Sequence, residues 1–230
     1  MNMRRILCGL LAVVLPLLTP GGASAVTSAQ TIISGAISVV EKASAQKDAD
    51  GMADTLRGAY AVAIVPSMFK AGFLVGGEYG EGLLLRRQDG KWYGPSFYNL
   101  GGGSFGLQIG ATEISLLMAV INQKGVKAFL SSKTKLGGEF TVAAGPLGRS
   151  AEAATDAQAK ASIYSYSMSR GLFAGVSLDG SVISVSVKRN EEYWKKKVSA
   201  KDALNIPAAD KRIQPLLKAL DSLIKKSKKK

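Results

Sequence analysis

The chain has no histidine and a single cysteine, Cys8, among its 230 residues. These absences exclude intramolecular disulfides, catalysis by a histidine-activated nucleophile, zinc sites built on Cys or His, and haem with a histidine ligand. Acidic residues are also scarce, with 17 Asp and Glu against 30 Lys and Arg, so the net charge is +13. We therefore expect no cofactor and no metal, and a preference for anionic partners.

The first 25 residues have the pattern of a secretory signal peptide. Arg4 and Arg5 precede an apolar run from Ile6 to Leu18, and Ala23-Ser24-Ala25 matches an A-x-A cleavage site. The run is shorter than the about 20 residues that a membrane-spanning helix needs. We expect cleavage after Ala25 and export to the periplasm or the medium, leaving about 205 residues for one domain with a hydrophobic core.

Glycine is concentrated between Gly72 and Gly110, a stretch that holds 12 of the 26 glycines and many large apolar residues. Glycine inside strands marks bends, bulges or the close approach of another backbone or a ligand. The stretch therefore predicts either a strongly curved sheet or a contact surface. We favour curvature, with the neighbouring cations making any contact to a ligand.

Around this stretch the patterns alternate between helix and strand. An apolar stripe at helical spacing predicts a helix over 27–44, which packs on the core or contacts lipid, and a short helix follows over 50–57. A strand over 60–65 should end at Pro66. Further strands are predicted over 83–88, 91–93, 104–110, 113–121, 139–144 and 163–168, and a short helix near 125–131. Helices over 199–204, opened by a capping box, and from Ile213 onward complete the chain.

Two dipeptides predict tight hairpins. Asp89-Gly90 places Arg87 opposite Trp92 and Arg86 opposite Tyr93 as cation–π pairs. Asp179-Gly180 predicts that residues 172–176 pair with 183–187, with a buried apolar face. The other face of that hairpin would carry Ser177, Ser184 and Ser186 as a wet or contact-making surface.

No motif supports an enzyme. Gly101, Gly103 and Gly106 spell G-x-G-x-x-G, but the residues between them alternate as in a strand, so a nucleotide site is excluded. Phosphate binding by backbone N–H groups of 100–104 stays open as a weaker alternative. Glu78 and Glu81 could form an acid–base pair only if they line a closed cavity. We assign no catalytic residue.

Basic clusters are the most informative charged feature. Lys195, Lys196 and Lys197 follow Tyr193-Trp194, an arrangement that suits a membrane interface but equally a solvated segment. Five lysines end the chain, and each cation near an anionic bilayer contributes roughly 1 kcal/mol.

Ordered motifs from about Leu56 to Trp194 resemble the SYLF family of lipid-binding domains. They include Ala63-Ile-Val-Pro66, Tyr79-Gly-Glu-Gly82, Leu100-Gly-Gly-Gly-Ser104, Thr155-Asp-Ala157, Ser169-Arg-Gly-Leu-Phe-Ala-Gly175 and Leu178-Asp-Gly-Ser181. The resemblance implies an α+β domain that binds membrane lipids, phosphoinositides in eukaryotic members, some of which also bind actin filaments. Actin enters only through this family analogy and is not expected as a partner of an exported protein, for which phosphatidylglycerol, cardiolipin or lipopolysaccharide is the expected anionic lipid.

Together these observations predict a mainly antiparallel, strongly curved sheet with an N-terminal helix and C-terminal helices packed against it. The expected layout is a signal peptide (1–25), a SYLF-type domain (26–198) and a helical extension with a lysine-rich tail (199–230). The predicted function is non-enzymatic binding of anionic lipid by a peripherally membrane-associated protein without a nucleic-acid partner. The lipid-contacting residues would be Lys70, Arg86, Arg87, Arg149, Arg170, Lys195, Lys196 and Lys197.

Two alternatives stay open. Arg170 could instead be a buried structural arginine that pairs with Glu81 or Asp156. The domain could also be an interaction module for an envelope protein, with the exposed sheet face as its interface.

Overall fold

The computed structural model describes residues 27–46, 49–145, 161–169, 172–176 and 178–226. One long antiparallel hairpin dominates it, formed by β1 (Ala61–Gln88) and β2 (Lys91–Val120). The two-residue loop, Asp89 and Gly90, has φ of 51° and 74°, as a type I′ turn requires. The predicted hairpin and its register are therefore confirmed, with Arg86 opposite Tyr93 and Arg87 opposite Trp92.

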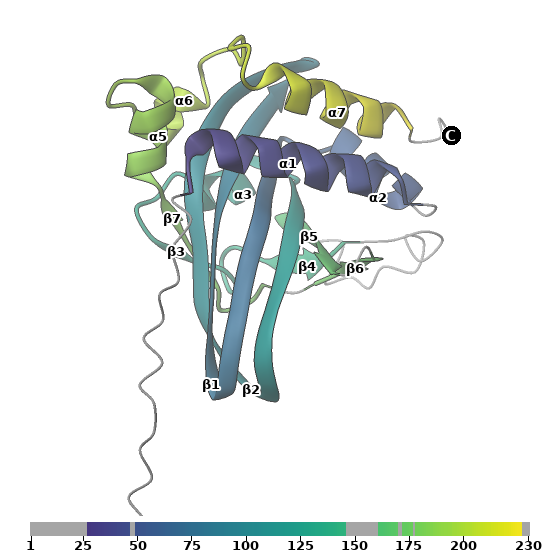
Figure 1. Ribbon diagram of the computed structural model, residues 1–230. Coiled ribbons are helices and arrows are strands. Elements are labelled where there is room, and N and C mark those ends of the chain that lie inside the picture. Colours follow the sequence, from purple (N-terminus) through teal and green to yellow (C-terminus); the bar gives the residue numbers. More distant parts are fainter. Residues whose placement is uncertain (1–26, 47–48, 146–160, 170–171, 177, 227–230) are drawn as a thin grey trace, which may run out of the picture.

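This hairpin bends back on itself, so the two halves of β1 lie side by side (Figure 1). At one end the Arg87 N–H donates to the Tyr60 carbonyl at 2.8 Å. Farther along, Gly80 packs so closely on the other half that a Cβ there would lie 2.7 Å from Val65 Cγ1 and 2.8 Å from the Ser67 carbonyl oxygen. Glycine thus permits the curvature, which confirms the predicted curved sheet.

Short strands extend the sheet along the edge of β2 that does not pair with β1. β5 (Ile163–Ser169) runs antiparallel to its final residues, and β7 (Val182–Val185) runs antiparallel to Tyr98–Gly101. β3 (Thr134–Lys135) pairs with β7, β6 (Leu172–Gly175) pairs antiparallel with β5, and β4 (Val142–Ala144) lies parallel to β5. The sheet is therefore mixed but mainly antiparallel, and the α+β class is confirmed.

The strands of the hairpin are longer than predicted. Pro66 does not end β1, because it lies in a bulge where the register shifts between Val65 and Met68, and a bulge tolerates the missing N–H of proline. Likewise, the strands predicted over 104–110 and 113–121 form one strand, β2, which ends at Val120. The 100–104 segment also lies inside β2 rather than in a phosphate-binding loop.

The second predicted hairpin is wrong. Asp179 and Gly180 do form a turn, but β6 before it pairs with β5, and β7 after it pairs with β2 and β3. Ile183 is buried opposite Leu100 of the central strand, whereas Leu172 is largely exposed. The serine face also does not form, since Ser186 is buried before a helix and Ser177 lies outside the described residues.

Side chains of the sheet alternate between two cores, as strand geometry requires. Val62 and Ile64 face α1 (Ala29–Ser44), α2 (Ala49–Arg57) and α7 (Gln214–Lys225), while Ala63 and Val65 face the opposite core with Phe129 of the segment after α3 (Gln123–Ala128). Figure 1 shows α1 and α7 lying next to each other across one end of the sheet.

The helix predicted over 27–44 packs on the core, because the apolar stripe of α1 is buried. The leucines of α7 are buried in the same core. α5 (Val187–Trp194) contacts α1 and β2, and α6 (Ala200–Ala203), which begins at the predicted Ser199 cap, contacts β2. Among the described residues, none of the helices is both long enough and apolar enough to cross a membrane.

Replacing Gly80 by alanine should destabilise the protein by about 1–3 kcal/mol, because the new methyl group would overpack the contact with Val65 and Ser67. Gly77→Ala is the matched control in the same strand, since the nearest atom to its Cβ, the Gly102 carbonyl oxygen, is 3.9 Å away. We expect that variant to stay within about 0.5 kcal/mol of the parent in urea unfolding. Equal effects of the two substitutions would contradict the close packing of the folded-back hairpin.

Candidate anion-binding site

A pocket of about 560 Å³ lies where the turn end of the long hairpin meets α3 and α6. Four cations line it, Arg86 and Arg87 from β1, Lys127 from α3 and Lys201 from α6. Among the described residues, no Asp or Glu lines the pocket. We call this site the basic pocket. Its lining is completed by the amides Gln88, Gln123 and Asn205 and by the apolar residues Tyr60, Val126, Leu130 and Leu204.

The two arginines are held in place by cross-strand aromatic rings. The Arg86 guanidinium lies 4.5 Å from the centre of the Tyr93 ring, and that of Arg87 lies 5.6 Å from the Trp92 ring, so both predicted cation–π pairs are confirmed. Arg86 also donates from Nε to the Leu204 carbonyl at 2.8 Å. Because these contacts restrict the side chains, the guanidinium groups are positioned before any ligand arrives.

Each arginine keeps donors that these contacts do not use. Arg86 gives one Nη to Gln88 Oε1 at 2.6 Å, and Arg87 gives one Nη to the Arg57 carbonyl at 3.3 Å. The Arg87 Nε is buried and has no hydrogen-bond partner within the described part of the chain. A buried donor without an acceptor costs free energy.

The lysines reach the pocket from two short helices. In α3, capped by the Asn122 side chain, Gln123, Val126 and Lys127 share one face because of their i, i+3, i+4 spacing. In α6, Ser199 Oγ accepts from the Asp202 N–H at 3.1 Å, which confirms the predicted helix cap at Ser199, and Lys201 of this helix lines the pocket. No local motif marks either lysine, and sequence reasoning missed both.

The other predicted contact residues lie elsewhere. Lys70 binds Glu78 Oε2 at 2.9 Å, and Glu78 Oε1 accepts from Ser181 Oγ at 2.6 Å, so this cation is already paired. Arg149 and Arg170 lie outside the described residues. Among the described members of the predicted contact set, Arg86 and Arg87 line the basic pocket, whereas Lys70 and Lys195 to Lys197 do not.

Lys195, Lys196 and Lys197 form an exposed run between α5 and α6. Lys195 takes a left-handed conformation, φ 56°, that ends α5 and directs the chain toward α6. In the described ranges none of the three has a carboxylate partner within ion-pair distance.

The aromatic pair before these lysines does not face outward as a membrane contact. Tyr193 is buried against Phe97, and Trp194 donates to the Pro95 carbonyl at 3.1 Å. Burial raises the pKa of Tyr193 to about 12, and the nearby Asp210 carboxylate acts in the same direction. Only the lysines are therefore available to an anionic surface at this point.

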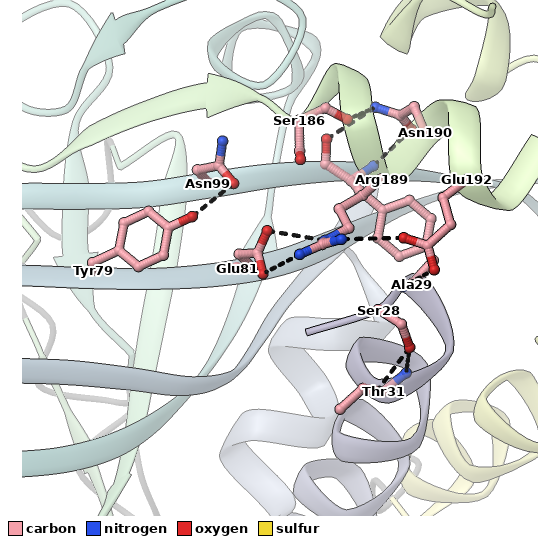
Figure 2. Close-up of polar contacts among 11 residues, drawn as sticks. Ser28, Ala29, Thr31, Tyr79, Glu81, Asn99, Ser186, Arg189, Asn190 and Glu192 are labelled. Atoms are coloured by element: carbon pink, nitrogen blue, oxygen red, sulfur yellow. Dashed lines mark hydrogen bonds and ion pairs between the residues drawn. The ribbon is translucent and has the colours of Figure 1, made fainter. Parts of the chain in front are cut away.

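Glu81 pairs with Arg189 of α5, a residue that sequence reasoning missed (Figure 2). Arg189 Nε and Nη2 donate to the two Glu81 oxygens at 3.1 and 3.2 Å, and Nη1 donates to Glu192 Oε2 at 3.2 Å. Burial opposes ionisation of Arg189, but the bonds to Glu81 and Glu192 outweigh it and raise the pKa of Arg189.

This network joins α5 to the hairpin and to the start of α1. Glu192 also accepts from the Ala29 N–H at 3.0 Å, so it links α5 to the first turn of α1, where a negative charge is favourable (Figure 2). Glu78 pairs with Lys70, whereas Glu81 pairs with Arg189. The structure therefore does not bring these two carboxylates together as an acid–base pair.

The fold is thus a curled mixed sheet covered by helices, and the four cations of the basic pocket have no carboxylate partner among the described residues. Residues 101–223, more than half of the chain, match the model of the Ysc84 family, described as "Las17-binding protein actin regulator". The chain therefore belongs to this family, the SYLF family that the sequence motifs predicted. The match extends beyond those motifs, which end near Trp194, and includes most of α7.

Eukaryotic relatives share the domain within longer chains. The rat SH3 domain-containing YSC84-like protein 1 is 41% identical over 143 residues, which are 61% of this chain and 42% of the relative. The LAS seventeen-binding protein 3 of Saccharomyces cerevisiae is 39% identical over 178 residues, 74% of this chain and 38% of the relative. Protein YSC84 of the same yeast is 37% identical over 176 residues. The chain thus spans less than half the length of these relatives.

Replacing Arg189 by methionine should destabilise the fold by roughly 3–5 kcal/mol, because it leaves the Glu81 carboxylate buried without its cation. Adding Glu81→Gln to Arg189→Met should recover part of that loss. A double-mutant cycle measured by urea unfolding gives the coupling between the two residues. Strictly additive single effects would contradict the pairing.

Proposed function

We propose that the chain is an exported, non-enzymatic domain that binds anionic membrane lipids at the membrane surface. The observation that carries the proposal is the basic pocket, where four cations from three elements meet without a carboxylate in the lining that the structure describes. The exposed run at Lys195 to Lys197 leads through Ser199 into α6, which carries Lys201 of the pocket. Both groups of cations can therefore contribute to one basic region.

The charge of the whole chain supports the same partner. Lysine and arginine residues exceed aspartate and glutamate residues by 13. Only a few of these cations are used in the two buried or partly buried ion pairs of the sheet, which involve Lys70 and Arg189. Binding would rest on lysines and arginines rather than on an inserted helix, because the apolar faces of α1 and α7 are occupied by the core. Such adsorption is weakened by salt.

Changing Lys195, Lys196 and Lys197 together to glutamine should weaken partitioning onto phosphatidylglycerol-containing vesicles. The decrease should reach the order of 100-fold, because each cation contributes roughly 1 kcal/mol to binding. Co-sedimentation measures this partition. The matched control changes Lys42, Lys133 and Lys218, three exposed lysines at separate places, to glutamine and should lose less binding. Equal binding to phosphatidylcholine vesicles, or no weakening in 1 M salt, would refute lipid binding by charge.

A protein partner is a second candidate. The family description and the name of the yeast LAS seventeen-binding protein 3 refer to Las17 binding, and two aromatic side chains of this domain are exposed next to each other. Phe69 and Tyr79 are 59% and 55% exposed and line a separate pocket of about 180 Å³ beside the start of α1. Exposed aromatic groups of this kind are typical of protein interfaces.

Changing Phe69 and Tyr79 to serine should abolish capture of a stoichiometric protein from envelope extract in the absence of lipid, if this surface binds a protein. Leu172→Ser is the control, because Leu172 is an exposed apolar residue on β6. Retention of the captured protein by the Phe69/Tyr79 variant, quantified in a pull-down, would exclude this surface. Loss of the protein in both variants would point to a general effect on the fold instead.

A further inference from the structure

The smaller pocket, beside the start of α1, has the size of one side chain. Its volume of about 180 Å³ lies below the range of about 300–1,000 Å³ that small-molecule sites occupy. It is closer to a cavity of about 150 Å³, which is known to hold a single benzene ring in a protein core. We call this site the N-terminal pocket. It is lined mainly by Thr27, Ile32, Pro66, Phe69, Tyr79 and Glu81.

The sequence at the start of α1 sets the direction in which the chain reaches this pocket. Ser28 is the N-cap, with an extended backbone (φ −119°, ψ 162°) and an Oγ that accepts from the Thr31 N–H at 3.0 Å. The residue before a cap often packs against the fourth residue of the helix and fixes the entry angle of the chain. Here these residues are Thr27 and Ile32, and both line the N-terminal pocket. Because consecutive Cα atoms are about 3.8 Å apart, Val26 is tethered beside the cavity.

The charges next to the pocket favour an additional cation. Glu81 lines the pocket, and Glu192 accepts from the Ala29 N–H at 3.0 Å in the first turn of α1 (Figure 2). Within the described ranges, Arg189 is the only cation paired with either carboxylate. The N-terminus of α1 adds about half an elementary charge, so part of the negative charge is still unbalanced.

We propose that Val26 becomes the first residue of the mature chain and docks here. Its side chain occupies the N-terminal pocket, and its α-ammonium group joins the group formed by Glu81, Arg189 and Glu192. The inference rests on the proposed export, because cleavage creates this cation. Hydrolysis of the Ala25–Val26 peptide bond consumes one water and leaves a carboxylate on the released peptide and an ammonium group on Val26. In the precursor the same nitrogen is an uncharged peptide N–H.

Two features single out this occupant. Of the four residues before Thr27, which are Ala-Ser-Ala-Val, only Val26 has an apolar side chain larger than a methyl group. A tethered residue also meets the pocket at a high effective concentration, which no free ligand of this size has. A protein partner of the Phe69 and Tyr79 surface would then meet it with the cavity already filled.

Nuclear Overhauser effects measured on the exported protein test the docking directly. The full precursor is produced in a bacterial host, and the mass of the exported chain, which we expect to begin at Val26, is determined first. Methyl-labelled valine should then show Overhauser contacts from Val26 to the ring protons of Phe69 or Tyr79, which line the pocket. Val26→Ala assigns the methyl signals, because they disappear in that variant.

Melting temperatures separate the two parts of the contact. Val26→Ala should lower the melting temperature by about 2–4 °C, because it removes two carbon atoms from the pocket. Val187→Ala is the matched control at a valine that is 62% exposed, and should change it by less than about 1 °C. A glycine inserted between Ala25 and Val26 keeps the valine but moves the ammonium group by one residue. That variant should lose about 1–2 °C.

The outcomes distinguish this inference from the proposed functions. An exported chain that still carries residues before Val26, or a chain that is not exported, overturns the docking together with the export. A chain that begins at Val26 but lacks the Overhauser contacts, or in which Val26→Ala melts like Val187→Ala, overturns the docking alone. Unchanged melting of the glycine insertion overturns the ammonium contact. In every case Val26→Ala should bind phosphatidylglycerol vesicles as the parent does, since it removes no cation, so the lipid proposal is tested separately.

Discussion

The close contact between the two halves of β1 is the constraint on which the rest of the structure depends. At Gly80 the neighbouring strand comes so near that no side chain fits between Val65 Cγ1 and the Ser67 carbonyl oxygen. Because the hairpin can fold back there, its Tyr60 and Arg87 ends meet through a main-chain hydrogen bond. That meeting brings Arg86 and Arg87 to the cavity that α3 and α6 complete. A straight hairpin would place these ends far apart, since each residue of a strand adds about 3.3 Å.

Charge is divided between two uses in this domain. Where a cation is needed to join elements, it meets a carboxylate, as Arg189 does with Glu81 and Glu192 between α5, the hairpin and the start of α1. Arg212 similarly pairs with Asp210, whose pKa is lowered by that hydrogen bond, and stacks on Tyr193. The cations of the basic pocket have no such carboxylate in the described structure, and their guanidinium groups are held by aromatic rings instead. This difference separates structural cations from those available to a ligand.

Sequence patterns predicted local features well and distant pairing poorly. The helix at α1, the helix cap at Ser199 and the Asp89-Gly90 hairpin each depend on residues within a few positions of one another, and each is present. The Asp179-Gly180 turn carries an equally strong local signal, yet its flanking strands pair with β5, β2 and β3. Ile183 gains a buried position opposite Leu100 in the central strand that the local hairpin could not offer.

The sequence by itself determined the family, the curved α+β architecture and the pairing of Arg86 with Tyr93 and Arg87 with Trp92. It could do so because ordered motifs, glycine positions and a two-residue turn are encoded locally. Only the tertiary structure decided which cations share a site, since Lys127 and Lys201 come from helices far along the chain from β1. It also decided that Glu81 binds Arg189, 108 residues away, and that the apolar faces of α1 and α7 belong to the core. Such choices depend on packing between distant elements, which no local pattern records.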